Sequence, residues 1–300
     1  MYRVISDGGC DFSKEEINKH NVEVVPFYIC FGDEAHLKEG VDISKEEYFN
    51  RLISDKGLYP KTAQPSPQDY IDVYAPHLKA GKDIISLTIS SKLSGSYSSA
   101  TLAVSMLKED YPDRIIAVID SSNVSIGQGL ILNEIVKMRD AGYDLHKTVE
   151  LAEEVLKTTR VYFTLESLEY LKRGGRIGPT TAFVGGILGL RPILQLEDGQ
   201  VSQLDNVRGK KNALKLIEEA IVDALKDNLQ DINLRVGHVL SEDDAITFKS
   251  NTEAALETTI TNPITGIGAA IGTHAGPGAL GFAYCKKYEA IRIEINAKIA

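Results

Sequence analysis

The chain has 300 residues, 43% of them hydrophobic and 25% charged, which is ordinary for a folded globular protein and excludes disordered and fibrous classes. Its 33 Lys and Arg residues against 42 Asp and Glu residues give a net charge of −9, so nucleic-acid partners are disfavoured and any anion site must be local. Three cysteines without C-x-x-C spacing, no signal core and no continuous apolar span favour a cytoplasmic protein with reduced thiols, no metal site and no stable membrane insertion.

Short apolar runs alternate with helical patterns in the first half of the chain. Ser13 and Glu16 have the spacing of a capping box, and Ser44 and Glu47 repeat it. We expect helices at about residues 14–20, 48–53, 68–80, 98–109, 129–141 and 144–158. The apolar runs predict buried parallel strands at residues 3–6, 22–30, 84–89, 115–120 and 161–165. This alternation is typical of a parallel sheet with helices on both faces.

The second half has a different pattern. Residues 195–206 predict a hairpin that turns at residues 197–199, and a helix follows from Lys210 to about residue 227. Further strands are expected at residues 232–240 and 280–285. We therefore predict an α/β protein of two domains: residues 1–165 as a parallel-sheet α/β domain, and residues 166–300 as an α+β domain with a mixed sheet.

Polar residues follow three of the predicted parallel strands, where open sheets bind their ligands. Asp7 follows the first strand and Asp120 ends the strand at 115–120. Between residues 86 and 101, nine of sixteen residues are Ser or Thr, and Ser94 and Gly95 lie at the expected start of a helix. Hydroxyls beside free helix N–H groups suit a carboxylate or a phosphate. The same hydroxyls would also serve to cap the helix and pack the loop.

Two other segments carry candidate binding groups. Pro65 and Pro67 hold the stretch before them extended, so that it would carry the Thr62 hydroxyl to a fixed place, although a plain loop would have the same pattern. His274 lies between glycine-rich segments near the C-terminus. A histidine is the side chain whose charge changes most readily near neutral pH, but a lone histidine is more often a structural residue.

Basic residues are concentrated in two clusters on this acidic chain. Residues 168–178 include Arg173, and residues 207–211 include Arg208. Such clusters suit an anion or an acidic partner surface, or form solvated helix ends. Between them, residues 180–194 form an apolar stretch interrupted by glycines, which would pack on a neighbour or line an apolar groove. The sequence has no P-loop and no kinase catalytic-loop signature, so it contains no nucleotide-binding motif.

Eight short segments, in this order and spacing, resemble the DegV family, which includes the FakB fatty-acid-binding subunits of bacterial fatty acid kinase. The segments are residues 6–7, 62–67, 91–97, 120–121, 171–177, 191–194, 208–211 and 274–278. The resemblance implies a non-enzymatic protein of two domains that encloses one long-chain, palmitate-like fatty acid and needs no cofactor.

The resemblance also assigns residues. It implies that Thr62, Ser94 and Gly95 bind the fatty-acid carboxylate with His274 beside it, and that Arg208 and Arg173 serve the head-group region or a partner. The implied partner is an ATP-dependent fatty acid kinase, which phosphorylates the bound carboxylate for lipid synthesis. Many relatives have Ser where this chain has Ala63, so one hydroxyl is missing here.

Two alternatives remain from the residues themselves. The first is a serine hydrolase or acyltransferase that uses Ser94 as nucleophile, His274 as base and Asp7 or Asp120 to orient the base. The missing G-x-S-x-G motif argues against it. The second is a phosphotransferase or small-ligand kinase, which the absence of a nucleotide-binding loop disfavours.

Overall fold

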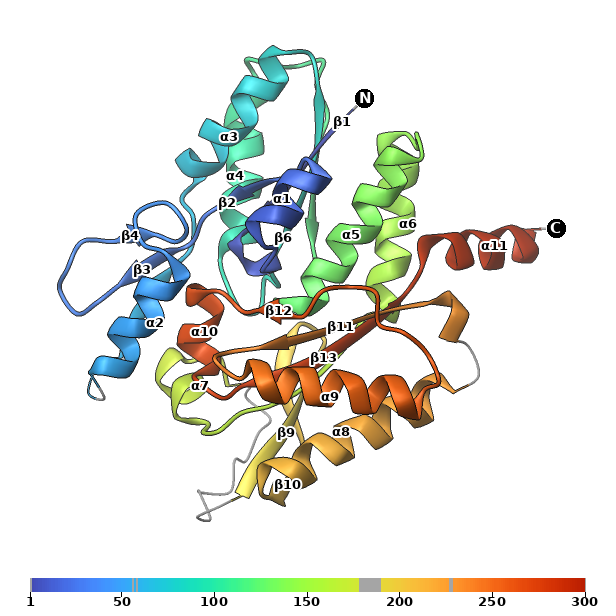
Figure 1. The fold of residues 1–300 in the computed structure, drawn as a ribbon. Helices are drawn as coiled ribbons and strands as arrows, with labels where there is room; N and C mark the ends of the chain where they lie inside the picture. Colours follow the sequence, from blue (N-terminus) through green and yellow to red (C-terminus); the bar gives the residue numbers. More distant parts are fainter. Residues whose placement is uncertain (1, 56, 58, 178–189, 227–228, 300) are drawn as a thin grey trace.

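The computed structural model describes residues 2–55, 57, 59–177, 190–226 and 229–299 (Figure 1). This part of the chain forms a parallel four-stranded sheet, a mixed six-stranded sheet and a small three-stranded sheet. The helices are α1 (Lys14–His20), α2 (Lys45–Ser54), α3 (Pro67–Lys79), α4 (Ser96–Leu107), α5 (Ile126–Asp140), α6 (Leu145–Thr158), α7 (Glu169–Gly174), α8 (Lys210–Leu225), α9 (Glu242–Ala255), α10 (Ala269–Ala275) and α11 (Tyr288–Ile299). No helix in the described part is long and apolar enough to cross a membrane.

The four-stranded sheet has helices on both faces, as predicted. Its strand order is β2 (Glu23–Val25), β1 (Tyr2–Asp7), β6 (Asp83–Thr88) and β7 (Ile116–Asp120). Because side chains alternate along a strand, Ile5 and Ile84 pack under α3 and α4, whereas Val4 and Ile85 face α5 and α6. The capping box at Ser13 is confirmed, since the Ser13 hydroxyl accepts the Glu16 N–H and the Glu16 carboxylate accepts the Ser13 N–H. At Ser44 only half of the predicted box forms, with the Ser44 hydroxyl accepting the Glu47 N–H.

The six-stranded sheet has the order β10 (Gln200–Arg208), β9 (Leu190–Glu197), β8 (Arg160–Thr164), β13 (Leu280–Lys286), β11 (Ile232–His238) and β12 (Thr265–Gly266). The predicted hairpin and the two later strands are therefore confirmed. Helices α8 and α9 cover one face through a cluster that includes Ile217, Phe248 and Phe282. Helix α5 contacts β8, β11 and β13 as well as β1 and β6, so it is packed between the two larger sheets. A helix that is buried around most of its circumference needs such a position.

Two strand predictions are wrong. Residues 22–30 form two strands, β2 and β3 (Tyr28–Cys30), which belong to different sheets. Pro26 lies between them and has no N–H to continue a ladder. The predicted parallel strand at 161–165 is β8, which pairs antiparallel with β13 and β9, because a short buried run does not specify strand direction.

The small sheet joins β3 to β4 (Leu37–Lys38) and to β5 (Lys61–Ala63), both antiparallel.

Helices α7, α9, α10 and α11 have no counterpart in the sequence predictions. The division into domains at residue 165 remains a prediction. Most of the apolar stretch at 180–194, namely residues 180–189, and the predicted end of the helix at 227 lie outside the described residues.

A buried ion pair connects the six-stranded sheet to α1. Arg235 of β11 is fully buried, and its Nη2 donates to Glu16 Oε1 at 2.5 Å while its Nε donates to Thr265 Oγ1 at 2.6 Å. The guanidinium also lies over the Phe12 ring, 5.2 Å from its centroid. A buried charge requires its partner, because its loss leaves an uncompensated ion in a medium of low dielectric constant.

We therefore expect Glu16→Gln to lower the free energy of unfolding by about 3 kcal/mol, measured by chemical denaturation at neutral pH. Glu15→Gln is the matched control, because Glu15 is exposed in the same helical turn and should change stability by less than about 0.5 kcal/mol. Equal effects of the two substitutions would contradict a stabilising role for the buried pair.

Candidate functional site

A cavity of about 100 Å³ lies beyond the carboxyl ends of β6 and β7, between the four-stranded sheet and elements of the C-terminal half. Most of its lining is apolar, and one region is polar. The apolar lining residues are Phe27, Ile89, Leu93, Val124, Phe163, Leu171, Ala270, Ile271 and Ala275. The polar lining residues are Thr62, Gln64, Ser94, Arg176 and His274. Ligand sites of open α/β sheets lie at this edge.

Thr62 and His274 meet in the polar region, although 212 positions separate them. Thr62 is held in the extended strand β5, where it pairs with Ile29, and its Oγ1 lies 2.7 Å from His274 Nε2. Alternation along β5 directs the next residue, Ala63, away, and Ala63 does not line the cavity. The absence of a hydroxyl at Ala63 therefore removes no polar group from the cavity wall.

His274 lies in the last turn of α10, beside α7. Burial, reinforced by the charge of Arg176, lowers its pKa to about 4, so the imidazole is neutral at pH 7. Its Nδ1 is buried and has no hydrogen-bond partner in the described part of the chain. This face of the ring packs on Gly174, where a Cβ would lie 2.1 Å from Nδ1. Only glycine leaves room for the ring there.

Arg176 supplies the positive charge of the cavity. Its Nη1 donates to the Gly174 carbonyl at 2.5 Å and its Nε to the Leu93 carbonyl at 3.2 Å. Among the residues described, no carboxylate pairs with this half-buried guanidinium, and burial lowers its pKa. An arginine stays protonated under these conditions. The cavity therefore contains a cation that can bind an anionic group.

The serine-rich loop contributes Ser94 to the cavity and ends at Gly95, the N-cap of α4. The Gly95 N–H donates to Gln64 Oε1 at 3.0 Å, and Gln64 Nε2 donates to Ser99 Oγ at 3.3 Å. The amide of Gln64 thus occupies the position at the helix N-terminus that the sequence suggested for an anion. Ser94, in contrast, lines the cavity directly.

Arg173 and Arg208 do not line the cavity. Arg173 is exposed on α7, where its Nε donates to Glu169 Oε1 at 2.6 Å and its guanidinium lies 3.6 Å from the Tyr59 ring centroid. Arg208 is exposed at the end of β10. The basic residue in the cavity is Arg176, which follows α7 where the chain turns back. The basic cluster is visible in the sequence, but the direction in which the Arg176 side chain points depends on tertiary structure.

The structure does not assemble a Ser-His-Asp triad from the proposed residues. His274 Nε2 contacts Thr62 and not Ser94. The Asp7 carboxylate accepts from the N–H groups of Gly9 and Ile89 and from the Gln128 side chain. Asp120 accepts from the Ser91 N–H of the serine-rich loop and from the N–H of Ser122, two residues after it in the chain. This arrangement gives the hydrolase or acyltransferase alternative no geometric support.

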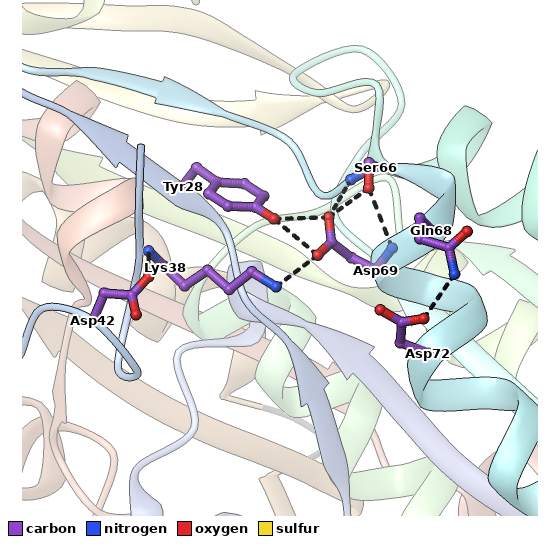
Figure 2. Close-up of polar contacts among 7 residues, drawn as sticks. All are labelled: Tyr28, Lys38, Asp42, Ser66, Gln68, Asp69 and Asp72. Carbon is purple, nitrogen blue, oxygen red and sulfur yellow. Dashed lines mark hydrogen bonds and ion pairs between the residues drawn. The ribbon is translucent and has the colours of Figure 1, made fainter. Parts of the chain in front are cut away.

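A polar cluster holds the segment that carries Thr62 (Figure 2). Asp69 of α3 accepts from Tyr28 Oη and Lys38 Nζ, both at 2.8 Å, and from the Ser66 hydroxyl at 2.6 Å. Burial acts to raise the pKa of Asp69, but these hydrogen bonds outweigh it and hold the pKa at about 2. Because Tyr28 lies in β3, which pairs with β5, and Ser66 caps α3, the cluster fixes the segment at both ends.

We expect Asp69→Asn to lower the free energy of unfolding at pH 7 by about 2 kcal/mol, through loss of charged hydrogen bonds. A depressed pKa contributes stability that is present above the unfolded value of about 3.9 and is lost as pH falls through the folded value. The difference between wild type and Asp69→Asn should therefore shrink between about pH 4 and pH 2. Asp72→Asn is the control, because Asp72 bonds Gln68 on the exposed face of the same helix. A difference that persists at low pH would contradict this account.

Two carboxylates hold the start of α10. Asp11 Oδ1 accepts the Gly268 N–H at 2.9 Å, and Glu39 Oε1 accepts the Ala269 N–H. Burial raises the pKa of Asp11 to about 6. Burial, with the nearby charge of Asp11, raises the pKa of Glu39 to about 7. The helix that carries His274 is thus anchored at its N-terminus by acids from the N-terminal half.

The fold and the site define a class: an α/β protein with a mostly apolar cavity whose polar region combines two hydroxyls, a neutral histidine and an arginine that has no carboxylate partner among the described residues. Such a cavity suits an apolar molecule with an anionic end. A family model described as "Uncharacterised protein, DegV family" matches residues 1–287. The chain belongs to the DegV family.

Known relatives resemble the chain over almost its whole length. A DegV domain-containing protein of Caldanaerobacter subterraneus is 35% identical over 288 residues, covering 95% of this chain and 98% of the relative. A stearic acid-binding protein from Eubacterium ventriosum superposes with a TM-score of 0.92 at 32% identity, covering 97% of this chain and 100% of the other. A fatty-acid-binding DegV family protein from Thermus thermophilus superposes with a TM-score of 0.86 at 30% identity, with coverages of 95% and 99%. The predicted family and the predicted fold class are confirmed.

Proposed function

We propose that the chain binds one long-chain fatty acid, with its carboxylate at Thr62, Ser94, His274 and Arg176 and its tail in the apolar part of the cavity. The observation that carries this proposal is the guanidinium of Arg176, which has no carboxylate partner in the described residues and lies at the wall of an apolar cavity. Two solved relatives at 30% identity or more bind fatty acids, which supports the same ligand class here.

The tail and the head group contribute differently to binding. Burying one methylene is worth about 0.8 kcal/mol, so about fifteen methylenes offer on the order of 10 kcal/mol before the costs of association are subtracted. A carboxylate removed from water must be paired or hydrogen-bonded. Arg176 supplies the charge, and the hydroxyls and the neutral imidazole supply hydrogen bonds. Affinity thus comes from the tail, and selection for an acid comes from the head-group residues.

We expect Arg176→Gln to weaken palmitate binding by about 10-fold or more, because a charged hydrogen bond is worth roughly 1.5–3 kcal/mol. Binding of hexadecanol, which has no charge, should change far less. Both affinities are measured by calorimetry after bound lipid has been extracted from the purified protein and identified by mass spectrometry. Lys172→Gln, a charge change at an exposed position of α7, is the control. An equal loss for palmitate and hexadecanol would argue against a carboxylate at Arg176.

We further propose that this cytoplasmic protein is a carrier and not itself an enzyme, and that an ATP-dependent fatty acid kinase phosphorylates the bound carboxylate to make an acyl phosphate for lipid synthesis. The resemblance of its motifs to the FakB subunits supports this step. Arg208 and Arg173 are exposed and lie outside the cavity lining, so both are accessible to an acidic partner surface.

With a purified fatty acid kinase and ATP, we expect palmitoyl phosphate to form only when this protein is present, and hydroxylamine trapping would detect it. Arg208→Ala should lower the rate of acyl phosphate formation severalfold and leave palmitate affinity unchanged, since Arg208 does not line the cavity. Lys215→Ala, at an exposed position of α8, is the control. Product formed by the chain and ATP alone would refute the carrier role.

A further inference from the structure

Two carboxyl groups from separate parts of the N-terminal half meet at the start of α10. Asp11 Oδ1 accepts the Gly268 N–H at 2.9 Å, and Glu39 Oε1 accepts the N–H of the next residue, Ala269. Both oxygens lie on the same side of the backbone, because a Cβ added to Gly268 would be 2.5 Å from Glu39 Oε1 and 2.9 Å from Asp11 Oδ1. The two carboxyl groups are therefore close neighbours.

No cation neutralises this pair in the described part of the chain. Neither Asp11 nor Glu39 takes part in an ion pair there, and Lys45 Nζ donates instead to the Gly266 carbonyl at 3.1 Å. The outer oxygens, Asp11 Oδ2 and Glu39 Oε2, are buried and have no hydrogen-bond partner among the described residues. Two neighbouring carboxylates that are buried without a counter-ion repel each other, and such a pair lowers its energy by binding one proton.

The pair titrates close to neutral pH. Burial raises the pKa of Asp11 to about 6. Burial, with the adjacent charge of Asp11, raises the pKa of Glu39 to about 7, against the opposite effect of the α10 N–H groups. As the pH rises from about 6.5 to about 8.5, the pair therefore goes from holding about one proton to holding none.

The other titratable and charged groups around the pair do not change their charge over this range. They are Cys10 beside Asp11, Lys45 and Tyr48 of α2, and Arg235 and His238 of β11. Burial raises the pKa of Cys10 to about 12 and raises that of Tyr48 as well, so both keep their protons. Burial lowers the pKa of His238, so its ring stays neutral, and Arg235 is already paired with Glu16.

The start of α10 determines one wall of the cavity. The helix has seven residues, and those that line the cavity are Ala270, Ile271, His274 and Ala275. Its far end is held by side chains, since Tyr48 Oη and Thr273 Oγ1 lie 2.7 Å apart and His274 contacts Thr62. The two carboxyl groups bind the residues directly before Ala270. Repulsion between them therefore acts on the part of the wall that Ala270 and Ile271 form.

We infer that Asp11 and Glu39 are positioning residues of the fatty-acid site, which hold α10 in place while they share one proton and displace its start when both are ionised. The inference rests on the proposed function. The proton leaves a carboxyl O–H bond and passes to solvent, and no other bond changes. Because the displaced wall is apolar, the loss of affinity extends to ligands without a charge. By linkage, a ligand that needs this wall in place raises the proton affinity of the pair.

The first test measures the melting temperature of the lipid-free protein at about pH 5.5 and about pH 8.5. An acid whose pKa is raised by folding costs stability as the pH rises above its unfolded value of about 4, so the pair should lower the stability of the wild type over this range. Glu39→Gln keeps the carbonyl oxygen that accepts the Ala269 N–H but cannot ionise. Its melting temperature should rise relative to that of the wild type by about 2 °C or more between the two pH values.

Two further variants complete this test. Asp11→Asn should have the same effect, and it keeps the inference testable if Glu39→Gln does not fold. Glu46→Gln removes a charge at an exposed position of α2, so its difference from the wild type should not depend on pH. Another buried acid, Asp7, titrates in every variant and cancels in these differences.

The second test measures the affinity for hexadecanol by calorimetry at about pH 6.5 and about pH 8.5. Hexadecanol has no titratable group, and neither His274, whose pKa is lowered to about 4, nor Arg176 changes its charge in this range. We expect the wild type and Glu46→Gln to bind hexadecanol about 3-fold or more weakly at the higher pH. Glu39→Gln should show no such loss.

An equal loss in Glu39→Gln and the wild type, or melting temperatures whose difference does not change with pH, would overturn the inference and leave the proposed function intact. Failure of the wild type to bind palmitate at either pH would overturn both.

Discussion

Helix α5 is the element on which the positions of both larger sheets depend. It is buried over most of its surface and contacts β1 and β6 of the parallel sheet and β8, β11 and β13 of the mixed sheet. Its close approach to β11 needs Gly237, because a Cβ there would lie 2.6 Å from Ile126 Cγ2. The cavity lies at the N-terminal end of this helix, where Val124 precedes it and Phe163 of β8 faces it from the other sheet. The sheet-to-sheet packing thus decides where a ligand can be enclosed.

The charge at the cavity has the opposite sign to the net charge of the molecule. The chain carries a net charge of −9, yet the charged side chain that lines the described cavity is the cation Arg176. His274 contributes no charge at neutral pH because burial and Arg176 lower its pKa. The buried acids Asp11 and Glu39 act elsewhere, on the opposite end of α10 from His274. A local positive site inside an acidic protein selects an anion by contact and not by long-range attraction.

Local signals in the sequence predict several of the elements that form the site. Capping serines and polar strand ends depend on near neighbours, and they predicted α1, the parallel sheet and the loop that contributes Ser94 to the cavity. Strand direction was not encoded in this way, because β8 has the same apolar pattern in a parallel or an antiparallel sheet. Local signals also do not encode the contact of Arg176 with the cavity, because this contact depends on the turn after α7. Helix α10 was missed because its glycines and alanines resemble a loop, and the acids that hold its start come from distant parts of the chain.

The order in which the chain is made has a consequence for this architecture. Thr62 and His274 are 212 positions apart, and the Arg235–Glu16 pair spans 219 positions. During synthesis the parallel sheet is complete more than a hundred residues before α10 emerges. Until then the apolar wall formed by Ile89, Leu93 and Val124 lacks its cover, as in any fold dominated by contacts distant in sequence. A nascent or truncated chain that ends before residue 269 is therefore the form most exposed to aggregation and to capture by chaperones.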